Sequence, residues 1–270
     1  MDQRRVLDQV RKWATADENV RLVVLTGSVA LGDHAVDELS DLDLELYVLD
    51  PAPLLDGRDW YGSFGRVLVR EELEDPDWHP TRLVYYVDGK IDFMIASVEA
   101  AKRGIAYARP YRVVLDKDGL AESLWLSSEP ARPPTPVEFD TCINWFYAAE
   151  LIMAKCIVRG EPWMAKVREW DANTQLLQMI EWDHKARHGW DYDTWHLGAH
   201  MQEWMDSEIV TAFGTCWSDF STHNMEAALS ASVALFDRLS GRTATVLRIE
   251  QFDSAPVRRE IDRLLGVRGE

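Results

Sequence analysis

The stretch Arg21-Leu22-Val23-Val24-Leu25-Thr26-Gly27-Ser28 decides the fold of the first half of this 270-residue chain. A short apolar run that stops at a glycine predicts a buried strand followed by a turn. After twelve further residues, the stretch Asp41-Leu42-Asp43-Leu44-Glu45-Leu46-Tyr47-Val48 alternates polar and apolar side chains, which predicts a half-buried strand. The first half of the chain is therefore expected to contain a sheet that includes both strands.

More elements are predicted on either side of this pair. Val6, Val10 and Trp13 recur at helical spacing, which indicates an amphipathic helix before the first strand. Further strands are expected at 66–70, 82–87, 90–96 and 111–115. The Asp88-Gly89 pair favours a two-residue hairpin turn between the second and third of these strands.

The second half of the chain has a different pattern. Residues 129–136 contain four prolines, which prevent both a helix and a central strand and mark a domain boundary. Beyond them, helical spacing predicts helices at 137–159, 164–188, 200–216, 221–240 and 255–265. We therefore predict an α/β (α+β) domain with a mixed sheet over residues 1–130, followed by an α-helical bundle domain over residues 131–270.

Composition restricts the partners and the compartment. The chain has 29 basic and 46 acidic residues, a formal charge of −17 and no Lys/Arg-rich run, so we expect no nucleic-acid partner. It shows neither a secretory signal pattern nor about 18 consecutive apolar residues, so we expect no membrane partner. Cys142, Cys156 and Cys216 are odd in number and widely spaced, which favours reduced thiols in the cytoplasm over disulfides or a zinc site.

Gly27, Ser28 and three aspartates form the motif that predicts chemistry. A glycine after a strand lets the backbone approach a phosphate, and the Ser28 hydroxyl and the amides of a short following helix can donate to phosphate oxygens. Because side chains alternate along a strand, Asp41 and Asp43 share one face, and the same parity in 90–96 adds Asp92. Three such carboxylates can hold Mg²⁺ for an in-line displacement at phosphorus. Each part alone is weak evidence, since an Asp-x-Asp pair on a strand is usually a solvated face.

These motifs resemble those of a known superfamily. Leu25-Thr26-Gly27-Ser28, Ser40-Asp41-Leu42-Asp43-Leu44 and Gly89-Lys90-Ile91-Asp92-Phe93 look like the signature of the DNA polymerase beta-type nucleotidyltransferases. The helical half is similar to the aminoglycoside (streptomycin) 6-adenylyltransferase family at Trp170, at Leu176-Leu177-Gln178-Met179-Ile180-Glu181-Trp182 and over 224–239.

The resemblance implies an enzyme that uses Mg²⁺ and ATP to adenylylate a hydroxyl of an aminoglycoside such as streptomycin, with release of pyrophosphate. This reaction would confer antibiotic resistance. In such enzymes Asp41, Asp43 and Asp92 would be metal ligands, and Asp92 would also be the general base on the acceptor hydroxyl. Gly27, Ser28 and Lys155 would bind the nucleotide, although an exposed helix face explains Lys155 equally well.

The helical domain is expected to bind the acceptor. Trp145, Glu150, Glu181 and Trp182 supply the aromatic faces and carboxylates that suit a polycationic sugar. Core packing is the usual role of aromatic residues at helical spacing, whereas acidic residues on apolar helices need another reason. His184 and His188 have the four-residue spacing of zinc ligands on a helix, but no third ligand is apparent, which favours a packing role.

Other functions remain open at this point. The same chemistry could act on a lincosamide, on another small molecule or on a protein. A non-catalytic nucleotide sensor on the same fold is a further alternative, which the presence of all three carboxylates disfavours. The oligomeric state stays open between a monomer and a homodimer.

Overall fold

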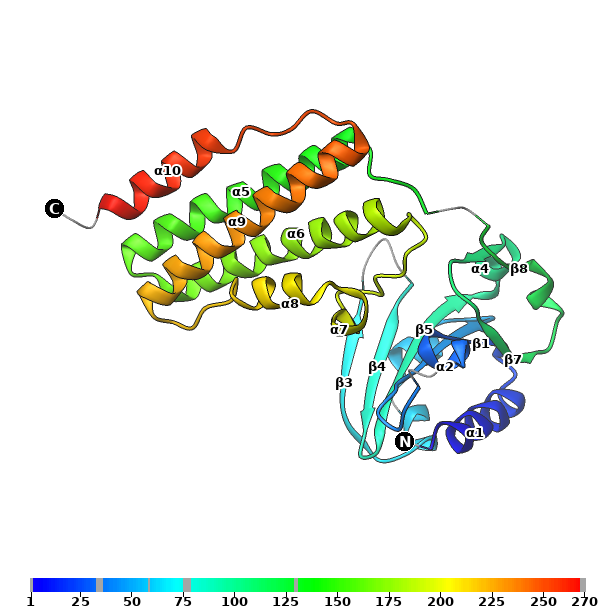
Figure 1. Ribbon diagram of the computed structural model, residues 1–270. Helices are drawn as coiled ribbons and strands as arrows, with labels where there is room; N and C mark the ends of the chain where they lie inside the picture. The colour runs from blue at the N-terminus through cyan, green and yellow to red at the C-terminus, as the bar shows by residue number, and fades with distance from the viewer. Residues whose placement is uncertain (1, 33–35, 58, 75–78, 129–130, 268–270) are drawn as a thin grey trace. The chain divides into compact units, whose positions relative to one another are not determined.

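The computed structural model describes residues 2–32, 36–57, 59–74, 79–128 and 131–267. The chain divides into two compact units, Met1–Glu129 and Pro130–Glu270, and each is described here by itself. Figure 1 shows strands in the first unit, together with short helices, and long helices in the second.

A six-stranded sheet forms the centre of the first unit. Its strand order is β3-β4-β5-β2-β1-β7, and the sheet is mixed because β2 and β5 run parallel while the other neighbours are antiparallel. This arrangement confirms the predicted fold class. The strands are β1 (Val20–Thr26), β2 (Leu42–Val48), β3 (Val67–Leu73), β4 (Thr81–Tyr86), β5 (Gly89–Ser97) and β7 (Arg112–Asp116).

The two faces of this sheet have different surroundings. Leu42, Leu44 and Leu46 of β2 lie in a core that also contains residues of α1 (Gln3–Ala16). Ile91, Phe93 and Ile95 of β5 belong to the same core. Tyr47 belongs to a second cluster, with residues of α4 (Val98–Lys102). Since successive strand residues alternate, Asp43 and Asp92 lie on the face opposite the α1 core.

Several short elements of the first unit were not predicted. They are the parallel pair β6 (Ile105–Tyr107) and β8 (Leu124–Leu126), helices α3 (Ala52–Asp56) and α4, and the 3₁₀ helices η1 (Trp60–Ser63) and η2 (Leu120–Ser123). In contrast, α2 (Gly27–Leu31) was anticipated as the short helix after the Gly27-Ser28 turn. Elements of three to five residues are too short for a hydrophobic period to be recognised.

The hairpin between β4 and β5 differs by one residue from the prediction. Tyr86 pairs with Gly89, so the two residues of the turn are Val87 and Asp88 instead of Asp88 and Gly89. Gly89 has a φ of +153°, a backbone conformation that favours glycine, and it is the first residue of β5. The glycine thus starts the strand instead of completing the turn.

The second unit is built from four long helices and two short ones. α5 (Pro136–Arg159), α6 (Pro162–His188) and α9 (Thr222–Leu247) run alongside one another, and α10 (Ala255–Gly266) packs against α5 (Figure 1). Their apolar side chains form one core, in which the rings of Phe146 and Phe236 stack with centroids 3.8 Å apart. By length and composition α5 could cross a membrane, but 56% of its most apolar window is buried in this unit, as in the core helix of a bundle.

The helix predicted at 200–216 is wrong as a continuous element. It consists of α7 (Met201–Trp204) and α8 (Ser207–Gly214), because Met205 and Asp206 have extended backbone ψ angles of 137° and 132°. The backbone N–H of Asp206 donates to Nε2 of His184, 3.0 Å away, and its carboxylate accepts from Arg187. These two tertiary hydrogen bonds stabilise the extended backbone that separates α7 from α8.

Candidate active site

Three neighbouring strands bring the predicted catalytic residues into one row. Thr26, the last residue of β1, pairs with Asp43 of β2, and Asp43 pairs with Asp92 of the parallel strand β5. Residues in register on adjacent strands share a face of the sheet. Asp41 lies two residues before Asp43, just outside the start of β2.

Gly27 makes the approach to this row possible. It has a φ of +67°, and a Cβ atom at this position would lie 1.9 Å from Oδ2 of Asp43. The close contact and the left-handed backbone both disfavour any residue other than glycine here. Gly27 and Ser28 begin α2, so the predicted phosphate turn directly adjoins Asp43.

The two strand aspartates are partly desolvated. Burial raises the pKa of Asp43, an effect that Lys90 opposes and Asp41 reinforces. Burial likewise raises the pKa of Asp92 to about 6. The bond to Lys90 lowers this pKa, whereas the negative charges of Asp43 and Asp41 raise it further. Among the described residues, Oδ1 of Asp92 is buried and has no hydrogen-bond partner.

Lys90 is the residue of this cluster to which the sequence analysis gave no role. Its Nζ donates to Oδ2 of Asp92 at 2.8 Å and to Oδ2 of Asp41 at 3.3 Å. Although burial by itself lowers the pKa of Lys90, the bonds to Asp92 and Asp41 raise this pKa overall. The strand parity that placed Asp92 also places Lys90, two residues earlier, on the same face, and this signal was available in the sequence.

The chemistry of the three carboxylates suits a hard cation, but two of them are paired with the Lys90 ammonium. Carboxylate oxygens are preferred ligands of Mg²⁺, and the unpartnered Oδ1 of Asp92 is an available donor. In the described parts of the chain, however, no three Asp, Glu, His or Cys side chains are grouped closely enough to hold a metal ion. The Lys90 ammonium pairs with both Asp41 and Asp92, so in this arrangement a lysine, not a metal ion, neutralises two of the three carboxylates.

A cavity of about 510 Å³ opens beside the row, within the first unit. It extends from β1 and β2 across β5 to β4, over the sheet face that carries Asp43 and Asp92. Its polar lining residues are Thr26, Asp43, Glu45, Tyr47, His79, Thr81, Asp92 and Arg103. The candidate active site therefore has room for a small molecule next to the carboxylates.

Glu45 occupies the next position on this face of β2 after Asp43. Its Oε2 accepts hydrogen bonds from the hydroxyls of Tyr47, at 2.7 Å, and of Tyr107. Burial raises the pKa of Glu45, while the two tyrosine bonds and the nearby His79 oppose this rise. In the sequence, Glu45 stood out only as part of the strand alternation and was not among the predicted site residues.

The predicted residues of the helical unit occupy different environments. Lys155 and Trp145 are exposed on α5, and Trp145 is 63% exposed. On α6, Trp182 is half-buried against Phe139, at 5.9 Å between ring centroids, and burial raises the pKa of Glu181 to about 7. No hydrogen bond or ring contact in the described structure joins Trp145, Glu150, Glu181 or Trp182 to one another.

Glu150 lies inside the core and is only 1% exposed. It accepts a hydrogen bond from Ser232 of α9 through Oε1, while Oε2 has no partner among the described residues. Burial raises the pKa of Glu150 to about 8, against the effect of the Ser232 bond. This position does not support a direct contact with an acceptor.

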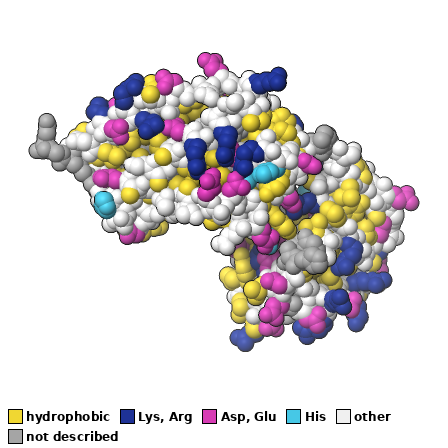
Figure 2. All heavy atoms as spheres, in the orientation of Figure 1, with side chains coloured by type: hydrophobic (Ala, Val, Ile, Leu, Met, Phe, Trp, Pro, Cys, Tyr) yellow, Lys and Arg dark blue, Asp and Glu magenta, His cyan; other side chains and the backbone are white. Residues whose placement is uncertain are grey.

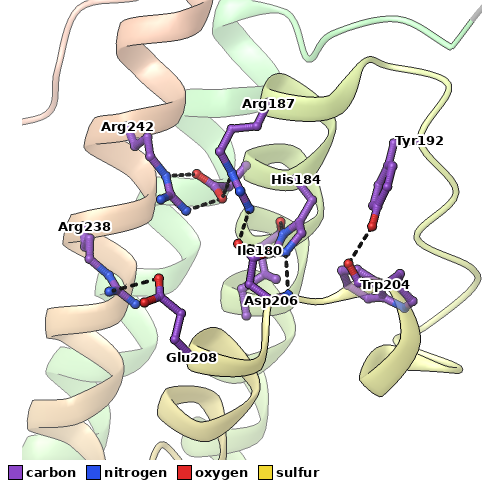
Figure 3. Close-up of polar contacts among 10 residues, drawn as sticks. Ile180, His184, Arg187, Tyr192, Trp204, Asp206, Glu208, Arg238 and Arg242 are labelled. Atoms are coloured by element: carbon purple, nitrogen blue, oxygen red, sulfur yellow. Dashed lines mark hydrogen bonds and ion pairs between the residues drawn. The ribbon is translucent and has the colours of Figure 1, made fainter.

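A network of ion pairs accounts for other polar residues of α6. Asp183 is fully buried and accepts bonds from Arg242 of α9 and from Arg187 (Figure 3). His184 is held between the carbonyl of Ile180 and the N–H of Asp206, so both of its ring nitrogens have partners within this unit. Figure 2 shows Lys and Arg side chains gathered beside Asp and Glu side chains on this face of the helical unit.

The sequence comparisons with known proteins agree on one family. Residues 1–256 match the family described as streptomycin adenylyltransferase. An aminoglycoside 6-adenylyltransferase of Campylobacter jejuni is 23% identical over 256 residues, covering 91% of this chain and 89% of the relative. One from Bacillus subtilis (strain 168) is 23% identical and covers 88% of each chain. The crystal structure of an aminoglycoside 6-adenyltransferase from Bacillus subtilis covers 98% of both chains at 19% identity, with a TM-score of 0.49.

Proposed function

This chain belongs to the streptomycin adenylyltransferase family, and we propose that it transfers the adenylyl group of ATP to a hydroxyl of an aminoglycoside such as streptomycin. The row of Thr26, Asp43 and Asp92 beside the Gly27 turn is the observation that carries this proposal. Such an activity would inactivate the antibiotic and so confer resistance. The two relatives named above are aminoglycoside 6-adenylyltransferases, which supports this class of acceptor.

The proposed reaction is a displacement at the α-phosphorus of ATP. The acceptor oxygen forms a bond to this phosphorus, the bond to the bridging oxygen breaks, and pyrophosphate leaves. The hydroxyl proton passes to Asp92, whose Oδ1 is not engaged by Lys90 or by other described residues. Burial raises the pKa of Asp92 in the protein without a bound ion, which makes its carboxylate a better proton acceptor than an exposed aspartate.

Asp41, Asp43 and Asp92 would hold Mg²⁺. Bound there, the ion would neutralise charge on the phosphate oxygens and on the leaving pyrophosphate. The Gly27-Ser28 turn would receive the phosphates, and the Ser28 hydroxyl would donate to them. Lys155 of the helical unit stays a candidate for a further triphosphate contact.

We assign catalysis to residues 1–130 and acceptor binding to residues 131–270. Trp145, Glu181 and Trp182 are the candidates on the acceptor side, because each is at least partly accessible in the helical unit. Glu150 supports such a role less well, since its side chain is enclosed in the core. A cytoplasmic enzyme with no nucleic-acid or membrane partner remains our expectation, with the choice between a monomer and a homodimer open.

The test uses Asp43→Asn and Asp92→Asn, which remove charge and preserve size. We expect pyrophosphate release with ATP, Mg²⁺ and streptomycin to fall by at least about 10³-fold in each variant, because both the ion and the proton acceptor depend on these carboxylates. Glu122→Gln, an exposed carboxylate of η2, is the matched control and should keep wild-type turnover.

Mass spectrometry of the acceptor distinguishes the alternatives. A gain of one adenylyl group on streptomycin supports the proposal. Transfer to a lincosamide or a protein, with none to a panel of aminoglycosides, contradicts the acceptor class. ATP binding without transfer to any acceptor would indicate a nucleotide sensor.

A further inference from the structure

The cavity beside the aspartate row extends away from the phosphate turn. Gly27 and Ser28 follow β1, on one side of Asp43, whereas the cavity continues on the other side over β5 and β4, where Met94 and Thr81 line it. If the phosphates occupy the turn, the space beyond Asp92 is left for the acceptor. This step rests on the proposed function.

One carboxylate in this space has no part in the chemistry at phosphorus. Glu45 lies two residues beyond Asp43 on the same face of β2, about 6.6 Å farther along the strand. Asp92 lies on the neighbouring strand β5, in register with Asp43, so it is roughly 8 Å from Glu45 along the diagonal between the two strands. This separation is comparable to the distance between a hydroxyl and a cationic substituent on one small sugar-like molecule. A group bound at Glu45 can therefore belong to the molecule whose hydroxyl lies at Asp92.

The surroundings of Glu45 fix the position of its carboxylate. Tyr47 and Tyr107 both donate to Oε2, and no described residue donates to Oε1. A carboxylate with one oxygen anchored and the other open to a cavity is suited to bind a guanidinium or an ammonium group. Beyond the aspartates, the cavity is also lined by Arg103, which is exposed and charged, and by the imidazole of His79.

We propose that Glu45 is a specificity-determining residue, which binds a guanidinium or ammonium group of the acceptor and thereby places the acceptor hydroxyl at Asp92. Tyr47 and Tyr107 are positioning residues that hold the carboxylate. This assignment gives the first unit a share in acceptor recognition, in addition to the residues of the helical unit.

The test separates the charge of Glu45 from its hydrogen bonds. Glu45→Gln keeps the size and an acceptor oxygen for the tyrosines but removes the charge. We expect KM for a cationic acceptor such as streptomycin to rise about 10-fold to 100-fold, as for the loss of a charge-assisted hydrogen bond, with KM for ATP and kcat within about 3-fold of wild type. Tyr107→Phe removes one of the two bonds that hold the carboxylate but retains its charge, so its KM for the acceptor should rise clearly less than that of Glu45→Gln.

Three results would overturn the inference. They are an unchanged acceptor KM in Glu45→Gln, a rise in KM for ATP instead, or an equal rise in Tyr107→Phe, which indicates a structural role. Glu122→Gln, which loses the same charge outside the cavity, should behave as wild type. If the wild-type protein itself transfers nothing to an aminoglycoside, the proposed function fails, whereas normal wild-type turnover with an insensitive Glu45→Gln rejects only the role of Glu45.

Discussion

Gly27 and Asp43 approach each other so closely that the Asp43 carboxylate can keep its position only because residue 27 has no side chain. A Cβ atom on residue 27 would lie 1.9 Å from Oδ2 of Asp43, well inside any real contact distance. Either Asp43 must then leave its place next to Asp92, or the turn must move away from β2. In both cases the phosphate turn and the carboxylate row separate.

Gly27→Ala should therefore lose activity beyond what its loss of stability explains. We expect the left-handed backbone to cost about 1 to 2 kcal/mol of unfolding free energy and turnover to fall at least about 10²-fold at saturating ATP and Mg²⁺. Urea unfolding and pyrophosphate release measure the two effects. Gly32→Ala is the matched control, because Gly32 has a φ of +64° but no atom within 4 Å of an added Cβ. Equal activity of the two alanine variants would contradict this account of Gly27.

Strand parity predicted the facing of Asp43 and Asp92 correctly, because the leucines of β2 and the apolar residues of β5 leave only one face for them. The same rule would have pointed to Lys90 and Glu45. Their contacts with Asp92 and Tyr107 depend on side-chain packing, which a period in the sequence does not contain. Glu150 shows the converse limit, since an acidic residue on an apolar helix can be stabilised in its neutral form instead of binding a ligand.

At the scale of helices and strands, tertiary contacts determine where helices end when the sequence pattern is ambiguous. The break between α7 and α8 at Met205 and Asp206 is held by bonds to His184 and Arg187 from another helix. Conversely, α9 continues to Leu247, beyond the predicted end at residue 240, although Gly241 weakens its helical propensity. Arg242 in this extra length binds the buried Asp183 of α6, which accounts for the continuation.

The contact between α5 and α9 at Glu150 should make stability depend on pH. Burial raises the pKa of Glu150 to about 8, above its unfolded value of 4.5, so its stabilising contribution is complete below pH 4.5 and is lost as the pH rises through 8. Glu150→Gln removes this loss. We expect it to be more stable than wild type at pH 9, by up to about 4 kcal/mol, with a much smaller difference at pH 5.

Urea unfolding at pH 5 and pH 9 measures this difference. Glu138→Gln is the control, since the bonds to Arg132 and Thr135 lower the pKa of Glu138 to about 2, so its contribution is equally present at both pH values. A Glu150→Gln variant whose advantage over wild type is the same at pH 5 and pH 9 would contradict a neutral Glu150 in the folded protein.

On the scale of the whole molecule, the family and the fold class were both predicted from the sequence. The match over residues 1–256 confirms the resemblance to the aminoglycoside (streptomycin) 6-adenylyltransferase family, which was seen at Trp170 and over residues 176–182 and 224–239. The Gly27-Ser28, Asp41-Leu42-Asp43 and Asp92 motifs carried the resemblance to the wider nucleotidyltransferase superfamily. These motifs could be recognised in the sequence because backbone geometry and charge allow only a few residue types at their positions. The residues that bind the acceptor were harder to predict, because Trp and Glu on helices can also belong to a core. Glu150 and Trp182 are examples.

The two units should also fold independently. The sheet carries two hydrophobic clusters and the helical unit carries one, and every residue of each cluster belongs to a single unit. Each unit has more than about 100 residues, enough to bury a core of its own. We therefore expect fragments 1–130 and 131–270 to give cooperative thermal transitions separately, each with native-like circular dichroism.

In the full chain, ATP and Mg²⁺ should raise the midpoint of the transition assigned to the first fragment, and Asp43→Asn should abolish this shift. A fragment 1–130 that remains unfolded on its own, or one transition in the full chain that matches neither fragment, would show that the units depend on each other for stability.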